Sequence, residues 1–202
     1  MHEYDPTTAL IVVDVQNDFA DPAGGLAVAG GEAIIEAVNR EIERAAAAGA
    51  TIVATQDWHP EHTPHFAQDG GIWPVHCVAG TWGAELHPSL ALPADAPRVH
   101  KGANGEDGYS CFTMRDPVRG DTIPTELEGI LRAVGTVSVT VVGLATDHCV
   151  KATALDAVRL GFLTAVVADA IAAVDLEPGD GARALEELDV AGVALEAPVE
   201  AA

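Results

Sequence analysis

The amino-acid sequence predicts an α/β protein with a doubly wound, mainly parallel sheet that has helices on both faces. Apolar runs that suit strands buried on both faces, such as residues 9–15 and 50–56, alternate with segments of helical periodicity, such as residues 30–49. This alternation indicates parallel strands joined by crossover helices. No repeat or low-complexity linker divides the chain, so we expect one domain over residues 1–202.

The predicted elements follow one another in regular order. The first strand, residues 9–15, is an apolar run with a single Asp in it. The helix at 30–49 repeats Ile34, Val38 and Ile42 at helical spacing and ends at a glycine. The later elements are strands at 50–56, 98–102, 138–146 and 162–169, helices at 124–135, 147–161 and 181–192, and a final edge strand at 192–197.

One connection is unusually long. Residues 57–98 are irregular and rich in Pro, Gly and His, and connections of that length inside a compact domain are usually functional. The turn after the first strand has no GxGxxG, and the chain has no GxxxxGK, so we expect no nucleotide cofactor.

Composition excludes several classes of partner. The formal net charge of −21 argues against nucleic acid and anionic membranes, and no apolar run approaches the roughly 18 residues of a membrane span. The N-terminus lacks the pattern of a signal peptide, so we expect a cytoplasmic protein.

The three cysteines are widely spaced without a CxxC, which indicates reduced thiols rather than a disulfide framework.

Four reactive side chains fall at the predicted ends of strands. Asp14 ends the first strand, Asp57 follows the second, Lys101 ends the third and Cys149 follows the fourth. Sites in open α/β sheets form outside the carboxyl ends of the strands. Taken alone, each residue also has a purely structural explanation, so their joint placement on one rim is the evidence for a site.

Cys149 is the best candidate for a nucleophile. It falls in the first turn of the predicted helix, where free N–H groups and the helix dipole favour a thiolate and can bind an oxyanion. Neighbouring helix residues point roughly 100° apart, so His148 is a poor base. Asp14 is the better one, and Lys101 can hold Asp14 and Cys149 in their charged forms. We expect Cys77 and Cys111 to act as small buried apolar residues.

The stretch DWHPEHTPHF suggests a metal site. Asp57 and His59 lie two residues apart and share one side of an extended segment, and His65 and His76 follow in the same loop. One carboxylate and three imidazoles suit Zn²⁺, Fe²⁺ or Mn²⁺. Loops rich in His without a metal are also common, and spacing alone leaves His62 as a further candidate.

Several longer stretches then match a known family. LIVVDVQNDF, GGLAVAGG, TQDWHP, WPVHCVAGTWGAELHP, KGANGEDGYSCF and VVGLATDHCVKATALDA occur in order, from about residue 9 to residue 168. In these stretches the chain resembles the nicotinamidases (pyrazinamidases) of the isochorismatase-like cysteine hydrolase superfamily.

The resemblance implies roles for individual residues. The family's Asp–Lys–Cys triad falls on Asp14, Lys101 and Cys149, and its metal ligands on Asp57, His59 and His76. A fourth protein ligand, His65, fits relatives that have His before Phe, although HTPHF departs from the NHxSF of others. The resemblance also implies an oxyanion hole at the N–H groups of Ala145 and Cys149, a cis peptide bond before Ala145, and a substrate pocket that includes Phe19, Leu26, Trp73, Tyr109 and His148.

The resemblance implies that the protein deamidates nicotinamide to nicotinate and ammonia, through a thioester and with one divalent metal ion. One alternative is a related amidase that acts on a ureido, carbamoyl or other small amide. Others are a metallohydrolase in which Cys149 is structural, and a binding protein without activity. The sequence leaves open which metal binds, whether the chain forms a homo-oligomer, and how nicotinamide ranks against pyrazinamide.

Overall fold

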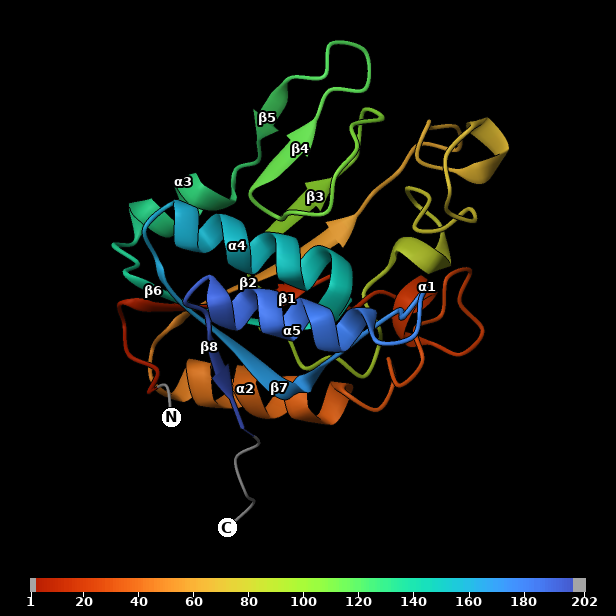
Figure 1. The fold of residues 1–202 in the computed structure, drawn as a ribbon. Helices are drawn as coiled ribbons and strands as arrows, with labels where there is room; N and C mark the ends of the chain where they lie inside the picture. Colours follow the sequence, from red (N-terminus) through yellow and green to blue (C-terminus); the bar gives the residue numbers. More distant parts are fainter. Residues whose placement is uncertain (1–2, 198–202) are drawn as a thin grey trace.

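The computed structural model describes residues 3–197, and a single parallel sheet runs through its centre (Figure 1). Its six strands have the order β3-β2-β1-β6-β7-β8, and every neighbouring pair is parallel. The predicted α/β class is therefore confirmed. Of the domain predicted for residues 1–202, residues 1–2 and 198–202 lie outside the described residues.

Every predicted strand and helix is present, with its ends shifted by a few residues. No helix in the described part of the chain has the length and apolar character needed to cross a membrane. The strands of the sheet are β1 Thr8–Val13, β2 Thr51–Asp57, β3 Arg98–Lys101, β6 Ser138–Leu144, β7 Leu163–Ala172 and β8 Ala194–Glu196. The main helices are α2 Ile35–Ala47, α3 Leu127–Ala133, α4 Lys151–Arg159 and α5 Asp180–Val190.

Short elements were missing from the sequence prediction. The antiparallel strands β4 (Thr113–Arg115) and β5 (Thr122–Pro124) form a hairpin that projects from the body of the molecule (Figure 1). Three residues are too few to display an alternating apolar pattern. The other short elements are α1 Asn17–Ala20, the 3₁₀ turns η1 Ala67–Asp69 and η2 Trp82–Ala84, and a π-helical turn, η3 Thr146–Val150, which precedes α4.

Helices cover both faces of the sheet, as predicted. Leu10 and Val12 of β1 belong to the apolar cluster that includes residues of α2. Ile11 and Val13 belong to the cluster on the other face, with residues of α3, α4 and α5. Side chains alternate between the faces of a strand, so β1 needs apolar residues at every position from Ala9 to Val13. This double burial explains the unbroken apolar run in the sequence.

The central strands β1 and β6 leave no room for a side chain at Gly143. Its φ is +111°, and a Cβ built there would lie 2.1 Å from the carbonyl oxygen of Val13. A side chain at this position meets both a disfavoured backbone conformation and another strand's backbone. Only glycine fits without moving β1.

We expect Gly143→Ala to lower the free energy of unfolding by on the order of 3 kcal/mol, measured by urea denaturation, since the added methyl group has to displace Val13. Gly129→Ala in α3 is the matched control. A Cβ there meets no atom within 4 Å, so this variant should gain about 0.5–1 kcal/mol. Equal stabilities of the two variants would contradict the close approach.

Candidate active site

The four strand-end residues predicted from the sequence meet at the carboxyl edge of the sheet. Lys101 is the last residue of β3 and Asp57 the last of β2, while Asp14 directly follows β1. Cys149 lies in η3, the turn after β6. Because β3, β2, β1 and β6 are consecutive neighbours, four distant sequence segments converge on one place.

Lys101 is the centre of this group. Its Nζ lies 2.7 Å from Asp14 Oδ2, 2.8 Å from Asp57 Oδ1 and 3.4 Å from Cys149 Sγ. The Lys101 side chain is 1% exposed and that of Asp14 is fully buried, so water screens these contacts little. One ammonium therefore contacts two carboxylates and the thiol.

Thr55 on β2 holds Asp14 in place. Its hydroxyl donates to Asp14 Oδ1 at 2.6 Å, and its oxygen accepts from the Asp14 N–H at 3.2 Å. Asp14 has a φ of +49°, a left-handed conformation that is uncommon outside glycine. The Thr55 contacts fix both the backbone and the side chain of this residue, so its carboxylate keeps one direction.

Burial opposes the ionised forms of Cys149 and Asp14. It raises the pKa of the Cys149 thiol well above its ordinary value and raises the pKa of Asp14, while the Lys101 ammonium opposes both effects. Burial opposes ionisation of Asp57 as well, but there the Lys101 ammonium prevails and holds the pKa well below its usual range. Lys101 thus favours the charged forms of Asp14 and Cys149 that we expected, and burial, which the sequence does not reveal, opposes them.

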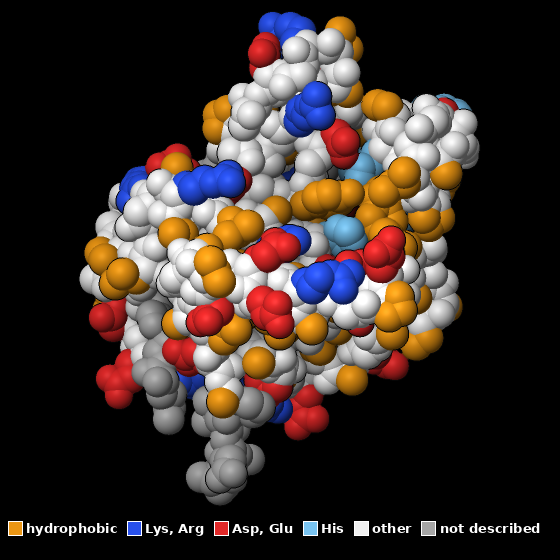
Figure 2. All heavy atoms as spheres, in the orientation of Figure 1, with side chains coloured by type: hydrophobic (Ala, Val, Ile, Leu, Met, Phe, Trp, Pro, Cys, Tyr) orange, Lys and Arg blue, Asp and Glu red, His pale blue; other side chains and the backbone are white. Residues whose placement is uncertain are grey.

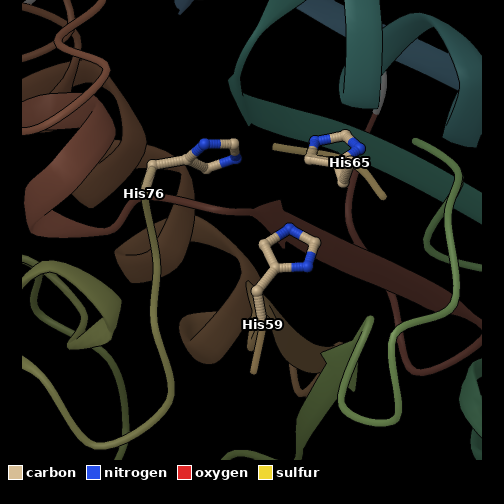
Figure 3. Close-up of side chains that lie close together, drawn as sticks. All are labelled: His59, His65 and His76. Atoms are coloured by element: carbon tan, nitrogen blue, oxygen red, sulfur yellow. The ribbon is translucent and has the colours of Figure 1, made fainter. Parts of the chain in front are cut away.

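Three histidines of the long loop converge beside this group. His59, His65 and His76 are all buried, and each offers a ligand atom within 4.8 Å of the others. Figure 3 shows the three rings pointing toward one another. His62 lies elsewhere: its side chain is 78% exposed and contacts Asp69. Of the two candidates left open by spacing, the structure brings His65 and not His62 into the cluster.

The ring contacts of the histidines fit a metal ion. Nδ1 of His65 contacts Asp107 Oδ1 and Nδ1 of His76 contacts the Pro74 carbonyl, each at 2.7 Å, which leaves both Nε2 atoms for a ligand. Both ring nitrogens of His59 are buried without a hydrogen-bond partner among the described residues. Burial lowers the pKa of His76 to about 4, so this ring is neutral, as a metal ligand must be.

Asp57 joins the two groups. Its Oδ1 contacts Lys101, and its Oδ2 lies 3.8 Å from His59 Nε2. The buried Gln16 side chain fixes the backbone here, donating to the Asp57 carbonyl at 2.7 Å and accepting from the Asp57 N–H at 2.8 Å. The donor set of three imidazoles and one carboxylate suits a single Zn²⁺, Fe²⁺ or Mn²⁺ ion.

A mainly apolar pocket opens above these residues, with about 350 Å³ of empty space, part of it open to solvent. Trp73 Nε1 donates to the Tyr109 hydroxyl at 3.0 Å, and both rings lie 5.0 Å from the ring of His148. Figure 2 shows histidine side chains among hydrophobic ones on this face, below the projecting hairpin. The lining residues are Phe19, Leu26, Val28, Asp57, His65, Trp73, His76, Tyr109, Leu144, Ala145, His148, Cys149 and Val174.

All five residues expected in a substrate pocket thus line it, together with Ala145 and Cys149. The peptide bond between Leu144 and Ala145 is cis. The Ala145 carbonyl accepts hydrogen bonds from the N–H groups of His148 and Val150. The roles that we expect for the five pocket residues in substrate binding, and for Ala145 and Cys149 in catalysis, remain predictions.

Several residues of the site were not singled out from the sequence. Thr55, Gln16 and Asp107 hold Asp14, Asp57 and His65 in place through contacts that span about 40 residues of chain. All three stand within stretches that match the family, which was the available signal. Val28, Leu144 and Val174 complete the pocket wall, and no local pattern distinguishes them from core residues.

The chain is similar to known proteins in both sequence and fold. The nicotinamidase/pyrazinamidase of Mycobacterium tuberculosis is 44% identical over 190 residues, covering 93% of this chain and 97% of that protein. The structure of Pyrococcus horikoshii pyrazinamidase in complex with zinc has a TM-score of 0.85 at 42% identity, over 96% of this chain and 100% of that one. PnC1 of L. infantum in complex with nicotinate has a TM-score of 0.88 at 37% identity, over 97% and 96% of the two chains.

The family comparison covers nearly the whole of the described chain. The model of the isochorismatase domain matches residues 8–196, from the first strand to the last. This span includes every residue of the candidate site, and the solved relatives share the same fold. The family resemblance read from the sequence is thereby confirmed, and the chain belongs to the isochorismatase family.

Proposed function

We propose that the protein is a nicotinamidase, an amidohydrolase that converts nicotinamide and water to nicotinate and ammonia. The observation that carries the proposal is that Asp57 links two groups: the Lys101 contacts to Asp14 and Cys149, and the cluster of three histidines. Its relatives named nicotinamidase and pyrazinamidase support the same activity.

We propose that His59, His65, His76 and Asp57 hold one divalent metal ion. The zinc complex of the Pyrococcus relative supports zinc as the first ion to test. When bound, the ion supplies a Lewis-acidic point to which the ring nitrogen of the substrate can coordinate. The chain itself orients the ring: Phe19 and Trp73 stand on the pocket wall as apolar surfaces against which a flat ring packs.

In the proposed first step, Asp14 takes the proton of the Cys149 thiol, and the thiolate attacks the amide carbon. Burial raises the pKa of both groups, which favours keeping one proton between them rather than releasing it to solvent. The Lys101 ammonium contacts both and stabilises whichever of them is charged. The N–H groups of Ala145 and Cys149 would bind the oxyanion.

Collapse of this tetrahedral intermediate breaks the carbon–nitrogen bond. Protonated Asp14 gives its proton to the leaving nitrogen, ammonia departs, and a thioester remains on Cys149. Ionised Asp14 then accepts a proton from water as the water attacks the thioester. Breaking the carbon–sulfur bond frees nicotinate, and the proton returns to the thiol, so both groups regain their starting state.

The histidine cluster favours this activity over a related amidase acting on a ureido, carbamoyl or other small amide. A cysteine amidase that needs only the triad has no use for three buried imidazoles, one of which lacks any hydrogen-bond partner in the described residues. The contact of Lys101 with Cys149 Sγ favours a thiol nucleophile over a metallohydrolase in which the cysteine is structural.

Further expectations follow from the proposal. Nicotinamide hydrolysis supplies nicotinate, so we propose a role in pyridine nucleotide salvage in the cytoplasm. We further propose that the chain works as one isochorismatase-like domain. The partner we propose is a small neutral amide, which a protein of net charge −21 does not repel.

We expect Cys149→Ala to lower kcat/KM for nicotinamide on the order of 10⁴-fold, measured as ammonia release, because the nucleophile is gone. Cys77→Ala is the control, since Cys77 is also a free buried cysteine but lies in an apolar cluster, where its sulfur donates to the Gly83 carbonyl at 3.9 Å. Alkylation of Cys149 without loss of activity would favour the metallohydrolase reading.

Removal of metal by a chelator should reduce nicotinamide hydrolysis more than about tenfold, and added zinc should restore it. The same chelator saturated with zinc beforehand is the control for direct inhibition. Full activity of the metal-free protein, with ureido or carbamoyl compounds as better substrates, would favour the related amidase instead.

Lys101→Met should lower the free energy of unfolding by about 3–5 kcal/mol and abolish activity, because it leaves two buried carboxylates without their counter-charge. The only other lysine, Lys151, pairs with the exposed Glu187, so Lys151→Met should cost at most about 1 kcal/mol. Urea denaturation measures both, and similar losses would show that the buried contacts are not the reason.

A further inference from the structure

One of the three converging histidines is held by a carboxylate from a different segment of the chain. His65 Nδ1 lies 2.7 Å from Asp107 Oδ1, and the two residues are 42 positions apart. His76 uses a carbonyl two residues before it, and His59 has no hydrogen-bond partner among the described residues. The His65 ring is therefore the one whose direction depends on a remote acidic side chain.

Asp107 is itself firmly placed. Its backbone pairs with Arg115 of β4, with the Asp107 N–H donating at 2.9 Å and the Arg115 N–H donating back at 2.6 Å. The Gly108 N–H donates to Asp107 Oδ1 at 2.8 Å. The base of the projecting hairpin thus fixes the oxygen that faces His65, so this carboxylate is an oriented group rather than a mobile surface side chain.

We propose that Asp107 is a positioning residue that strengthens metal binding at the histidine cluster. A carboxylate that accepts from Nδ1–H selects the tautomer with a free Nε2 lone pair and makes that nitrogen a better ligand. It also holds the His65 ring in the direction of His59 and His76 (Figure 3). The inference rests on the proposed function, because it needs a metal ion in the cluster.

The long loop that carries His65 also contains a matched pair, His62 and Asp69, without this role. His62 Nδ1 lies 3.1 Å from Asp69 Oδ1, so it forms the same kind of contact as His65 with Asp107. The His62 side chain is 78% exposed and that of His65 is 7% exposed. Asp69→Asn removes the same charge as Asp107→Asn, but the hydrogen bonds of the Asp69 side chain go to residues outside the histidine cluster, such as His62 and Thr63.

The test compares zinc affinities of the metal-free parent, Asp107→Ala, Asp107→Asn and Asp69→Asn, each in competition with a chromogenic chelator. Asp107→Ala should bind zinc about 10- to 100-fold more weakly than the parent. Asp107→Asn should fall between them, because its amide oxygen can still accept from Nδ1–H without the charge. Asp69→Asn should stay within about twofold of the parent.

A second readout separates positioning from general stability. Thermal unfolding of the metal-free proteins reports any purely structural loss, which would lower the Tm without changing zinc affinity. If the zinc affinity of Asp107→Ala lies within about twofold of the parent's, the inference is wrong and the proposed function stands. A parent that binds none of Zn²⁺, Fe²⁺ and Mn²⁺ overturns the inference and the proposed metal site, while ammonia release from nicotinamide tests the proposed activity separately. The affinities decide the inference whether or not the parent hydrolyses nicotinamide.

Discussion

A single buried ammonium organises the reactive centre. Lys101 lies within 2.8 Å of both Asp14 and Asp57 and 3.4 Å from Cys149, with almost no access to water. If both carboxyls and the thiol were ionised, one positive charge would face three negative ones. Burial makes that state costly: it raises the pKa of Asp14 and of Cys149 and so favours a proton on one of them, while Lys101 holds the pKa of Asp57 well below its usual range. That proton is the one the proposed chemistry moves.

The sheet explains why these groups meet, and why much of the site could be predicted. Parallel strands end at one edge, so Lys101, Asp57, Asp14 and Cys149 can be placed together once their strands are recognised as apolar runs. The fold class follows from the same runs, since β1 must be apolar on both faces. The hairpin β4–β5 escaped prediction because its strands have only three residues each.

The residues that orient the centre were harder to find, for a physical reason. Thr55, Gln16 and Asp107 act through hydrogen bonds to partners about 40 positions away, and no local periodicity encodes such contacts. The charge states were hidden in the same way. A helix start suggests a thiolate, but burial raises the pKa of the Cys149 thiol well above its ordinary value. Burial is a property of the assembled fold rather than of a sequence window.

The arrangement also has a cost, which the rest of the fold must offset. Replacing a buried charge cluster with apolar side chains often stabilises a protein, so we do not expect the charges around Lys101 to stabilise the fold more than apolar side chains would. The site draws on both apolar clusters: Phe19 and Ala145 belong to one, and Cys149 to the other. Packing on each face of β1 and β6 therefore supports the charged groups from two sides. Because the same packing fixes the distances around Lys101, stability and chemistry rest on the same strands.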